Sequence, residues 1–409
     1  MSLLSFDQAL EQLLAGATPL TQTETVAGFD ALGRVLAAPQ FSSIAVPSLD
    51  NSSMDGYALR CADVPAAGAR LTVAQRIPAG SVGHTLTAGT AARIFTGAPI
   101  PAGADAVVMQ ELCALEGGED KAAPQVVINH VPRPGEWIRR CGEDIQSGAE
   151  ILAAGARLSP QQLGLAASVG IAQLPVYRRL RVALFSTGNE LVMPGEIAPA
   201  AMVPGTIYNS NRYLLRGLLL QLGCEVSDLG IVPDNLAATR QALRTAALEN
   251  DLILTSGGVS VGEEDHVKPA VQAEGELGLW KIAIKPGKPL AFGRVGRAAF
   301  IGLPGNPVSS FVTFVMLVRP FILKTQGAQV ESPSRLSLRA DFELPQADAR
   351  REFLRVRRNG TGGLDLFPNQ SSAVLTSVAW GDGLVDNPAG QVVRRGDLVS
   401  FLPLTELIY

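Results

Sequence analysis

The sequence predicts a multidomain α/β plus β protein. Three observations lead to this prediction: the chain has 409 residues, helix-like and strand-like segments alternate from residue 178 onward, and short β-type runs broken by Gly and Pro dominate elsewhere. A single hydrophobic core stops growing at roughly 250 to 300 residues. We therefore expect several domains, each with its own core.

A small helical/mixed domain is expected from residues 1–46 together with 145–177. Ser5 and Gln8 form the pattern of a capping box in front of an apolar stripe, which predicts an amphipathic helix of about three turns. A second helix is expected at residues 159–171, SPQQLGLAASVGI, where a proline occupies the first helical position.

Residues 47–144 predict a β-rich domain inserted between these two pieces. Its short runs RLTVAQRI, ARIFTG, DAVVMQ and QVVINHV are rich in strand-forming residues and are separated by Gly and Pro. Residues 328–409 return to the same character, with RLSLRADFEL, REFLRVRR and DLVSFLPL, and predict a C-terminal β-barrel-like domain.

Residues 178–327 predict a central, doubly wound, mostly parallel α/β domain. RVALFSTGNEL, CEVSDLGIV and DLILTS are typical of strands, whereas NSNRYLLRGLLLQLG and LAATRQALRTAALEN are typical of helices. AAFIGLPGNPVSSFVTFVMLV adds a strand, a turn and a long helix. Strands that alternate with helices of this length form a parallel sheet covered on both faces.

Composition excludes several classes of protein. A formal net charge of −4 argues against a general nucleic-acid binder, which needs a basic face. The 4 cysteines form no CxxC pair, so they indicate neither a zinc site nor a disulfide framework. The N-terminal residues lack the pattern of a secretion signal, and no uninterrupted apolar run reaches the length of a membrane span. We expect a cytoplasmic protein without membrane contact.

Candidate ligand-binding residues follow the predicted parallel strands, because ligands bind at the carboxyl ends of such strands. One exit, TSGGVSVGEEDHVK, contains Ser256, Gly257 and Gly258. Glycines without a Cβ let backbone N–H groups approach an anion, so the exit resembles a phosphate cradle. It lacks the P-loop and GxGxxG patterns, and a tight turn with a helix cap explains the glycine pair equally well.

A second exit, GLPGNPVSSF, contains Pro304, Gly305 and Pro307. Pro307 suits the first turn of a helix, and Gly305 leaves backbone N–H groups that can point at an anion. An ordinary helix start explains this stretch almost as well.

Three acidic residues, Glu190, Asp234 and Asp265, each lie at or just past the end of a different predicted strand. The fold would bring them to one rim, where crowded carboxylates repel each other unless a cation lies between them. Mg²⁺ fits this arrangement, because it takes one or two protein carboxylates and completes its shell with water and phosphate. Taken singly, each acid is more often a helix cap or a solvated residue.

The run WKIAIKPGKPLAFG contributes Lys281, Lys285 and Lys288. Lys281 and Lys285 are separated by an even number of residues, so an extended chain places them on one face. The Pro and Gly residues stiffen the turn, which favours a role in holding an oxyanion. A solvated lysine face is the alternative, and for Lys288 it is equally well supported.

Further candidates lie in the β-rich domain and in the C-terminal domain. Asp55 belongs to the polar stretch DNSSMDGY, and Thr96 and Asp144 follow downstream. Turn chemistry accounts for the Asp-Gly pair but poorly for the Met and Tyr beside it. In ARREFLRVRR, alternating arginines predict a strand with a basic face, with phosphate binding as the minor alternative.

Taken together, six segments resemble the molybdopterin molybdenumtransferases, the family related to the catalytic E domain of gephyrin. They are DNSSMDGYAL, RIFTGAPIPAGADAVV, FSTGNEL, ILTSGGVSVGEEDHVK, KIAIKPGKPLAFG and GLPGNPVSSF, in the family's order and spacing. Asn235 departs from the pattern, because a second acid is frequent there. By resemblance, the functional positions are Asp55, Thr96, Asp144, Glu190, Asp234, Asp265, Lys281, Lys285, Pro304 and Pro307.

The resemblance implies an enzyme that inserts molybdate into adenylylated molybdopterin, uses Mg²⁺ and releases AMP. It also implies an elongated homodimer of four-domain subunits, with the cleft between the α/β domain of one subunit and the β-rich domain of the other. Other cofactor-biosynthesis proteins and molybdoenzymes are further expected partners. Two alternatives remain open at this point: a molybdopterin adenylyltransferase, and a non-catalytic scaffold like that of gephyrin's relatives.

Overall fold

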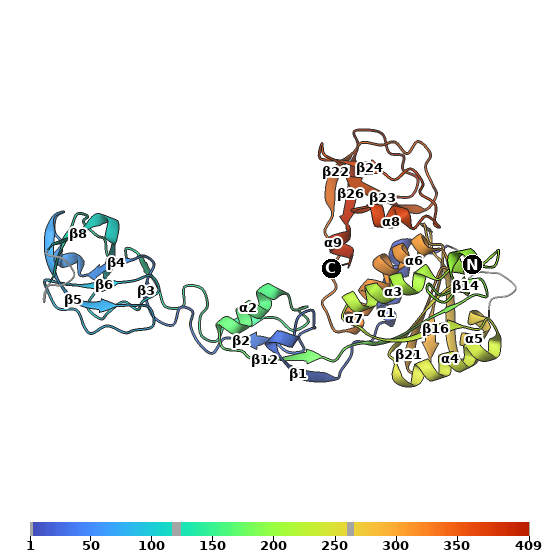
Figure 1. Ribbon diagram of the computed structural model, residues 1–409, viewed down its shortest axis with the longest axis horizontal. Coiled ribbons are helices and arrows are strands. Elements are labelled where there is room, and N and C mark those ends of the chain that lie inside the picture. Colours follow the sequence, from blue (N-terminus) through green and yellow to red (C-terminus); the bar gives the residue numbers. More distant parts are fainter. Residues whose placement is uncertain (1–2, 117–123, 260–265, 409) are drawn as a thin grey trace. The chain divides into compact units, whose positions relative to one another are not determined.

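The computed structural model describes residues 3–116, 124–259 and 266–408 (Figure 1). The chain forms two compact units. The larger comprises Met1–Ala38, Ala154–Pro160 and Gln173–Tyr409, and the smaller comprises Pro39–Ala153 and Gln161–Ala172. The sheets and helices confirm a multidomain α/β plus β fold. The division into four domains at the predicted boundaries stays a prediction.

The central sheet of the larger unit has the strand order β16-β13-β17-β21-β20-β18. The first four strands are parallel to their neighbours, whereas β20 and β18 run antiparallel, which confirms a mostly parallel sheet. The strand bounds are β13 Arg181–Thr187, β16 Glu225–Val232, β17 Leu252–Ser256, β18 Gly275–Lys281, β20 Pro289–Val295 and β21 Ala298–Leu303.

Helices cover both faces of this sheet, as Figure 1 shows. Phe185 of β13 points to the face covered by α4 (Leu236–Glu249) and α5 (Val267–Glu274). Its neighbour Leu184 points to the opposite face, covered by α3 (Ser210–Gln221) and α6 (Pro307–Thr313). Successive residues of a strand point to opposite faces, so a sheet covered on both sides needs continuous apolar strands. The doubly wound arrangement is confirmed.

The helix after β21 is part of the core. It runs from α6 through a π-helical turn, Phe314–Val318, into α7 (Arg319–Thr325). Within the described ranges, Pro307–Thr325 is the one helix long and apolar enough to cross a membrane, and 89% of its apolar window is buried inside the protein. That burial is typical of a core helix.

Helix starts follow their capping residues. α1 (Phe6–Gly16) begins after Ser5, and the predicted capping box with Gln8 is confirmed. Asn209 caps α3 by accepting the N–H of Arg212 at 3.1 Å, and Asn235 caps α4 by accepting the N–H of Ala238 at 2.8 Å. Asn235 therefore has a structural role at the position where an acid is frequent in the family it resembles.

The C-terminal strands close into a barrel, which confirms the β-barrel-like expectation. The order β23-β24-β22-β26-β25 returns to β23 through an additional pairing. The short strand β19 (Ile284–Lys285) leaves the α/β region and pairs in parallel with β23. The barrel strands are β22 Leu336–Ala340, β23 Arg351–Arg358, β24 Gly363–Leu366, β25 Gly383–Asn387 and β26 Leu398–Pro403.

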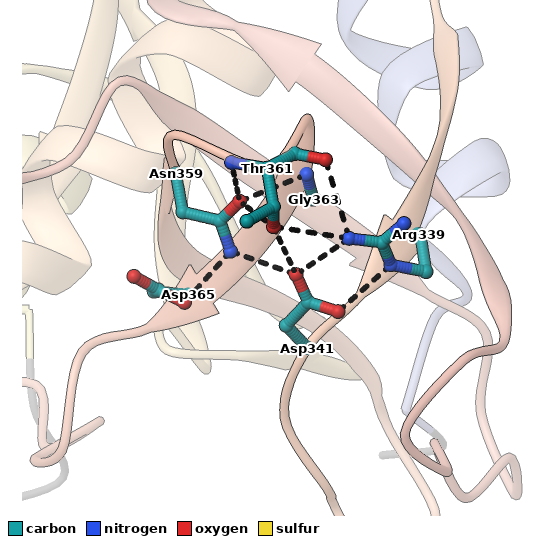
Figure 2. A network of polar contacts seen from close by, with 6 residues as sticks. All are labelled: Arg339, Asp341, Asn359, Thr361, Gly363 and Asp365. Carbon is teal, nitrogen blue, oxygen red and sulfur yellow. Dashed lines mark hydrogen bonds and ion pairs between the residues drawn. The ribbon is translucent and has the colours of Figure 1, made fainter.

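A polar network holds the turn between β23 and β24 (Figure 2). The Asp341 carboxylate accepts hydrogen bonds from Arg339 at 2.8 Å and from Nδ2 of Asn359 at 2.8 Å. The Oδ1 of Asn359 accepts the N–H groups of Thr361 and Gly363, both at 3.0 Å. The hydrogen bonds from Arg339 and then Asn359 hold the pKa of Asp341 well below its usual range. The network fixes the geometry of this turn.

Strand β23 is not the basic face that its alternating arginines predicted. Leu354 and Val356 point into the barrel, while Phe353 packs on Phe6 of α1 with ring centroids 5.5 Å apart. Arg355 is only 2% exposed. Because the barrel is closed and α1 packs on its outside, both faces of residues 352–356 are buried, and only the last two arginines of the strand are exposed.

The smaller unit contains the expected β-rich sheet, with strand order β7-β4-β6-β5-β9-β8. Its strands are β4 Gly56–Leu59, β5 Ala69–Ile77, β6 Thr90–Ile94, β7 Ala106–Met109, β8 Cys113–Glu116 and β9 Gln125–Ile128. Two short pairs accompany it: β3 (Asn51–Ser52) with β10 (Ile138–Arg139), and β2 (Gln40–Phe41) with β11 (Glu150–Leu152).

The remaining α-helices and strands of the two units are α2 Pro160–Ser168, β1 Thr23–Ala27, β12 Gln173–Tyr177, β14 Leu191–Val192, β15 Ile207–Tyr208, α8 Thr376–Trp380 and α9 Leu404–Ile408.

Candidate functional site

A pocket of about 1040 Å³ lies at the carboxyl ends of the parallel strands. β13 and β17 are neighbours in the sheet although β16 comes between them along the chain, so the strand order reverses there. Ligands of open α/β sheets bind at this kind of topological switch point. The predicted site residues among its lining are Glu190, Asp234, Ser256, Gly257, Gly258, Lys285, Lys288, Pro304, Gly305 and Pro307.

Two of the three predicted metal ligands, Glu190 and Asp234, line this pocket. Asp265 lies outside the described residues. Within residues 3–116, 124–259 and 266–408, no group of three or more His, Cys, Asp or Glu side chains is placed to hold a metal. The three-acid magnesium site therefore stays a prediction.

The chain turns tightly after β13, and the Glu190 carboxylate lies over Gly188. Gly188 has φ +145°, and a Cβ atom there would lie 2.5 Å from Oε2 of Glu190. The positive φ favours glycine at this position. The backbone oxygen of Glu190 accepts the N–H of Ile207 at 2.8 Å, which ties the exit of β13 to β15.

The glycine pair after β17 forms a tight turn. Gly257 and Gly258 have φ +89° and +67°, which favour glycine. A Cβ atom on Gly258 would lie 2.3 Å from Cγ2 of Val267. The N–H of Gly257 donates to the carbonyl oxygen of Leu303 at 3.1 Å. The sheet therefore uses this N–H, and the expectation of a phosphate cradle formed by backbone N–H groups of the turn stays a prediction.

The lysines divide between two sheets. Lys281 ends β18 and is not among the pocket-lining residues, whereas Lys285 lies in β19 and lines the pocket together with Lys288. The chain leaves the α/β sheet between Lys281 and Lys285 to pair with β23 of the barrel. A bend at Ala283 lies between them, and the expectation that these two lysines share one strand face stays a prediction.

Lys285 is bound to acids of the barrel rather than solvated alone. Its Nζ lies 2.9 Å from Oε1 of Glu352 and 3.2 Å from Oδ2 of Asp348. Glu352 is 2% exposed, and its hydrogen bond is the main cause that raises the pKa of Lys285. Arg350 also binds Asp348, at 2.9 Å, and lines the pocket. Lys285 is therefore a charged, positioned side chain at the pocket wall.

A loop of the barrel forms a pocket wall that the sequence did not predict. Gln370 accepts the backbone N–H of Arg355 at 2.9 Å and donates to its carbonyl oxygen at 3.0 Å. The carbonyl oxygen of Ser372 accepts the N–H of Val308 at 3.0 Å, in the first turn of α6. The lining residues of this loop are Gln370, Ser371, Ser372, Ala373 and Leu375.

Asn211 of α3 also lines the pocket, and the sequence did not predict it as a site residue. Its Nδ2 donates to Oγ of Ser256 and to the carbonyl oxygen of Gly305, each at 2.7 Å. These partners are 45 and 94 residues away along the chain. The polar run NSN marked a helix cap but carried no signal for these distant contacts.

In the smaller unit, the predicted residues Asp55 and Thr96 are in direct contact. Oδ1 of Asp55 accepts the N–H of Thr96 at 2.7 Å and its hydroxyl at 2.9 Å. These two hydrogen bonds, the backbone one foremost, lower the pKa of Asp55. Asp144 is exposed, and its N–H donates to the carbonyl oxygen of Val46 at 3.0 Å. Local turn chemistry alone does not account for a contact between residues so far apart.

A neighbouring acid, Asp50, has a different environment. It accepts the N–H of Cys141 at 2.8 Å and pairs with Arg140 at 2.6 Å. The backbone bond from Cys141 is the largest cause affecting its pKa, which is lowered. Asp50 thus fastens the segment around residue 140 to the start of the DNSSMDGY stretch.

The fold and this pocket define a multidomain enzyme built around a molybdopterin-binding type of α/β domain. Three family models match the chain: "MoeA N-terminal region (domain I and II)" over residues 4–170, "Probable molybdopterin binding domain" over 183–324 and "MoeA C-terminal region (domain IV)" over 337–404. The chain belongs to the molybdopterin molybdenumtransferase family.

Individual relatives agree with this assignment. The molybdopterin molybdenumtransferase of Haemophilus influenzae is 44% identical, over 86% of this chain and 85% of the relative. Molybdopterin molybdenumtransferase 2 of Mycobacterium tuberculosis is 36% identical, over 99% and 100%. The crystal structure of the molybdopterin biosynthesis moeA protein from Pyrococcus horikoshii OT3 superposes with a TM-score of 0.83 at 28% identity, over 98% of this chain and 100% of that one.

Proposed function

We propose that this enzyme inserts molybdate into adenylylated molybdopterin and releases AMP in a Mg²⁺-dependent reaction. One observation supports the proposal above all: a pocket at the switch point of the sheet combines acids from two strand exits with Lys285, which pairs with the barrel, and Lys288, which precedes β20. A substrate that carries phosphates and receives an oxyanion needs both kinds of group. Relatives of nearly full length carry the name molybdopterin molybdenumtransferase.

In this proposal, the strand exits after β17 and β21 bind the pterin nucleotide. Ser256, Gly257 and Gly258 form one side of the pocket, and Pro304, Gly305 and Pro307 form the other. A Cβ atom at Gly305 would lie 3.8 Å from Cα of Gly257, so the two turns lie against each other. The two turns would orient the substrate along this edge of the sheet.

Lysines would attract the molybdate anion. Lys285 and Lys288 line the pocket, and Lys281, at the end of β18, would contribute further positive charge. Glu352 and Asp348 hold the Lys285 ammonium group in place. A fixed cation binds an oxyanion with less loss of side-chain freedom than a mobile one.

The residues present fit a magnesium ion. Glu190 and Asp234 give the pocket two carboxylates, which is the number that Mg²⁺ commonly takes from a protein, and Asp265 is the proposed third. When bound, Mg²⁺ would neutralise negative charge on the phosphates as AMP leaves. The Glu190 carboxylate lies over the glycine turn at Gly188, at the edge of the pocket.

Asp55, Thr96 and Asp144 belong to the smaller unit, and we propose that they complete the site in a homodimer, where the β-rich domain of one subunit faces the α/β domain of the other. Other cofactor-biosynthesis proteins and molybdoenzymes would be further partners. A cytoplasmic location without nucleic-acid or membrane partners accords with the net charge of −4 and with the burial of 89% of the apolar window in the long helix.

The proposal is tested by AMP release. Purified enzyme, adenylylated molybdopterin, molybdate and Mg²⁺ should give AMP and molybdenum cofactor, and Asp55→Ala and Asp265→Ala should lose turnover. Wild-type rates in both variants would overturn the roles given to these two residues.

The two alternatives have their own tests. A molybdopterin adenylyltransferase would transfer AMP from ATP to bare molybdopterin, so that incubation should give no product here. Near full-length similarity to molybdenumtransferases does not favour this activity. A purely structural scaffold would leave molybdoenzyme activity intact in a deletion strain, whereas the proposed enzyme would not.

A further inference from the structure

Asn211 joins three segments at the pocket floor. It is the second residue of α3 and is 8% exposed. Its amide nitrogen reaches Oγ of Ser256 at the end of β17 and the carbonyl oxygen of Gly305 in the turn after β21, both at 2.7 Å. All three residues line the pocket.

The chemistry of the partners fixes the orientation of this amide. The carbonyl oxygen of Gly305 can only accept, so the NH₂ group of Asn211 must face it. The second N–H of that group then points at Ser256, whose Oγ acts as acceptor. The hydroxyl proton of Ser256 cannot lie along the same line and must point elsewhere.

The same orientation leaves Oδ1 of Asn211 buried without a hydrogen-bond partner among the described residues. A buried unpaired acceptor costs free energy, so a native site that keeps one needs a reason. Here both donors of the amide are already used on Ser256 and Gly305. The arrangement leaves Asn211 incompletely paired, but it fixes the orientation of the Ser256 hydroxyl.

We propose that Asn211 is a positioning residue that makes the Ser256 hydroxyl a hydrogen-bond donor to the bound pterin substrate. Ser256 is 3% exposed and lines the pocket, so its freed proton serves a ligand acceptor such as a phosphate or ring oxygen. This inference rests on the proposed function for the identity of the ligand. In this arrangement Asn211 is the donor to Ser256, and Ser256 is the donor to the ligand.

A double-mutant cycle tests the proposal. The dissociation constant of molybdopterin is measured anaerobically for wild type, Asn211→Leu, Ser256→Ala and the double variant, because Leu keeps the branched shape of Asn without its donors. Each single variant should bind about tenfold more weakly, as expected for one lost hydrogen bond to a charged group. The double variant should bind no more weakly than Ser256→Ala alone, since Asn211 acts through Ser256.

Asn250 supplies a matched control. It is also 8% exposed, its Nδ2 donates to the carbonyl oxygen of Ala246 at 3.0 Å, and its Oδ1 has no partner among the described residues. It lies at the end of α4 and is not a pocket-lining residue. Asn250→Leu should lower the melting temperature without changing the dissociation constant.

The proposal is overturned if the loss of affinity in the double variant equals the product of the two single losses. It is also overturned if Asn211→Leu binds molybdopterin as tightly as wild type. If Asn211→Leu does not fold, Asn211→Asp takes its place, because a carboxylate keeps the shape but lacks the NH₂ group. The measurement is of binding and not turnover, so an enzyme without AMP release could still show the coupling. That outcome would reject the proposed function and leave the role of Asn211 intact.

Discussion

Oδ1 of Asp55 accepts both the backbone N–H and the hydroxyl of Thr96, at 2.7 and 2.9 Å. These bonds lower the pKa of Asp55, because they stabilise its carboxylate form. We expect Asp55→Asn to reduce kcat about 100-fold if the charge takes part in the reaction. Thr96→Val removes the hydroxyl bond and should raise the pKa of Asp55, which moves the acid limb of the kcat/KM profile to higher pH.

Asp50→Asn is the control for this pair, because Asp50 also accepts a backbone N–H in the same unit, from Cys141 at 2.8 Å. It should weaken the unit without a comparable loss of kcat. Equal losses of kcat in Asp50→Asn and Asp55→Asn would mean that both acids only support the local fold.

The proposed magnesium site predicts a shift in metal dependence. Asp234 lines the pocket beside the strand exits, whereas its neighbour Asn235 is the N-cap of α4. Asp234→Asn should raise the Mg²⁺ concentration for half-maximal AMP release about tenfold or more, because a ligand is lost. The measurement is a Mg²⁺ titration at fixed substrate.

Asn235→Ala removes the cap and should cost about 1 kcal/mol of stability, with an unchanged Mg²⁺ midpoint. The two positions are adjacent, so a general disturbance of the loop would affect both titrations alike. An identical Mg²⁺ midpoint in wild type and Asp234→Asn would exclude Asp234 as a ligand.

The ion pair between Lys285 and Glu352 predicts separable effects on binding and stability. Lys285→Met should weaken molybdate binding about tenfold, through loss of one charged donor. It should also cost about 2 kcal/mol of unfolding free energy, because Glu352, 2% exposed, loses its lysine partner. Isothermal titration with molybdate and chemical unfolding measure the two effects.

Lys285→Met combined with Glu352→Gln removes both charges. This double variant should recover most of the lost stability and none of the lost molybdate affinity. Recovery of binding together with stability would show that Lys285 matters for the fold and not for the anion.

Helix starts and strand exits could be predicted from the sequence because their causes are local. Ser5 and Gln8 cap α1 within one turn, and Asn209 caps α3 in the same way. The polar sequences after β13, β17 and β21 fall at one pocket because parallel strands place their carboxyl ends on one edge. The hydrophobic period and the helix caps therefore predict the α/β domain and the strand exits that line the pocket.

The remaining parts depended on contacts between distant segments. No local pattern predicts that Gln370 bonds to the backbone of β23, or that Asn211 binds residues 45 and 94 positions away. The alternation of residues in β23 predicts that Arg355 lies on a solvated face. Such a prediction holds only when one side of the strand is open to solvent. Barrel closure and the cover by α1 decide that burial, and neither is a local property.

The stability of the barrel should depend on pH through a buried ion pair. Asp386 is 3% exposed and accepts hydrogen bonds from Arg351 at 2.6 Å and from Arg335. Burial alone would raise the pKa of Asp386, but the two arginines outweigh it and the pKa is lowered. Asp386→Asn should cost about 3 kcal/mol of unfolding free energy at pH 7, measured by denaturant unfolding, because two arginines lose a buried partner.

The pH dependence follows from the sign of this shift. A lowered folded-state pKa contributes stability that is complete above the unfolded value, about 3.9, and is lost as the pH falls through the folded value. The difference between wild type and Asp386→Asn should therefore be constant from pH 7 to about 5 and shrink below about 4. Asp382, which pairs with the exposed Arg358 at 3.5 Å, is the control, and Asp382→Asn should cost under about 1 kcal/mol. A difference for Asp386→Asn that stays constant down to pH 3 would contradict the lowered pKa, since protonation of the wild-type carboxylate would then play no part in the pair.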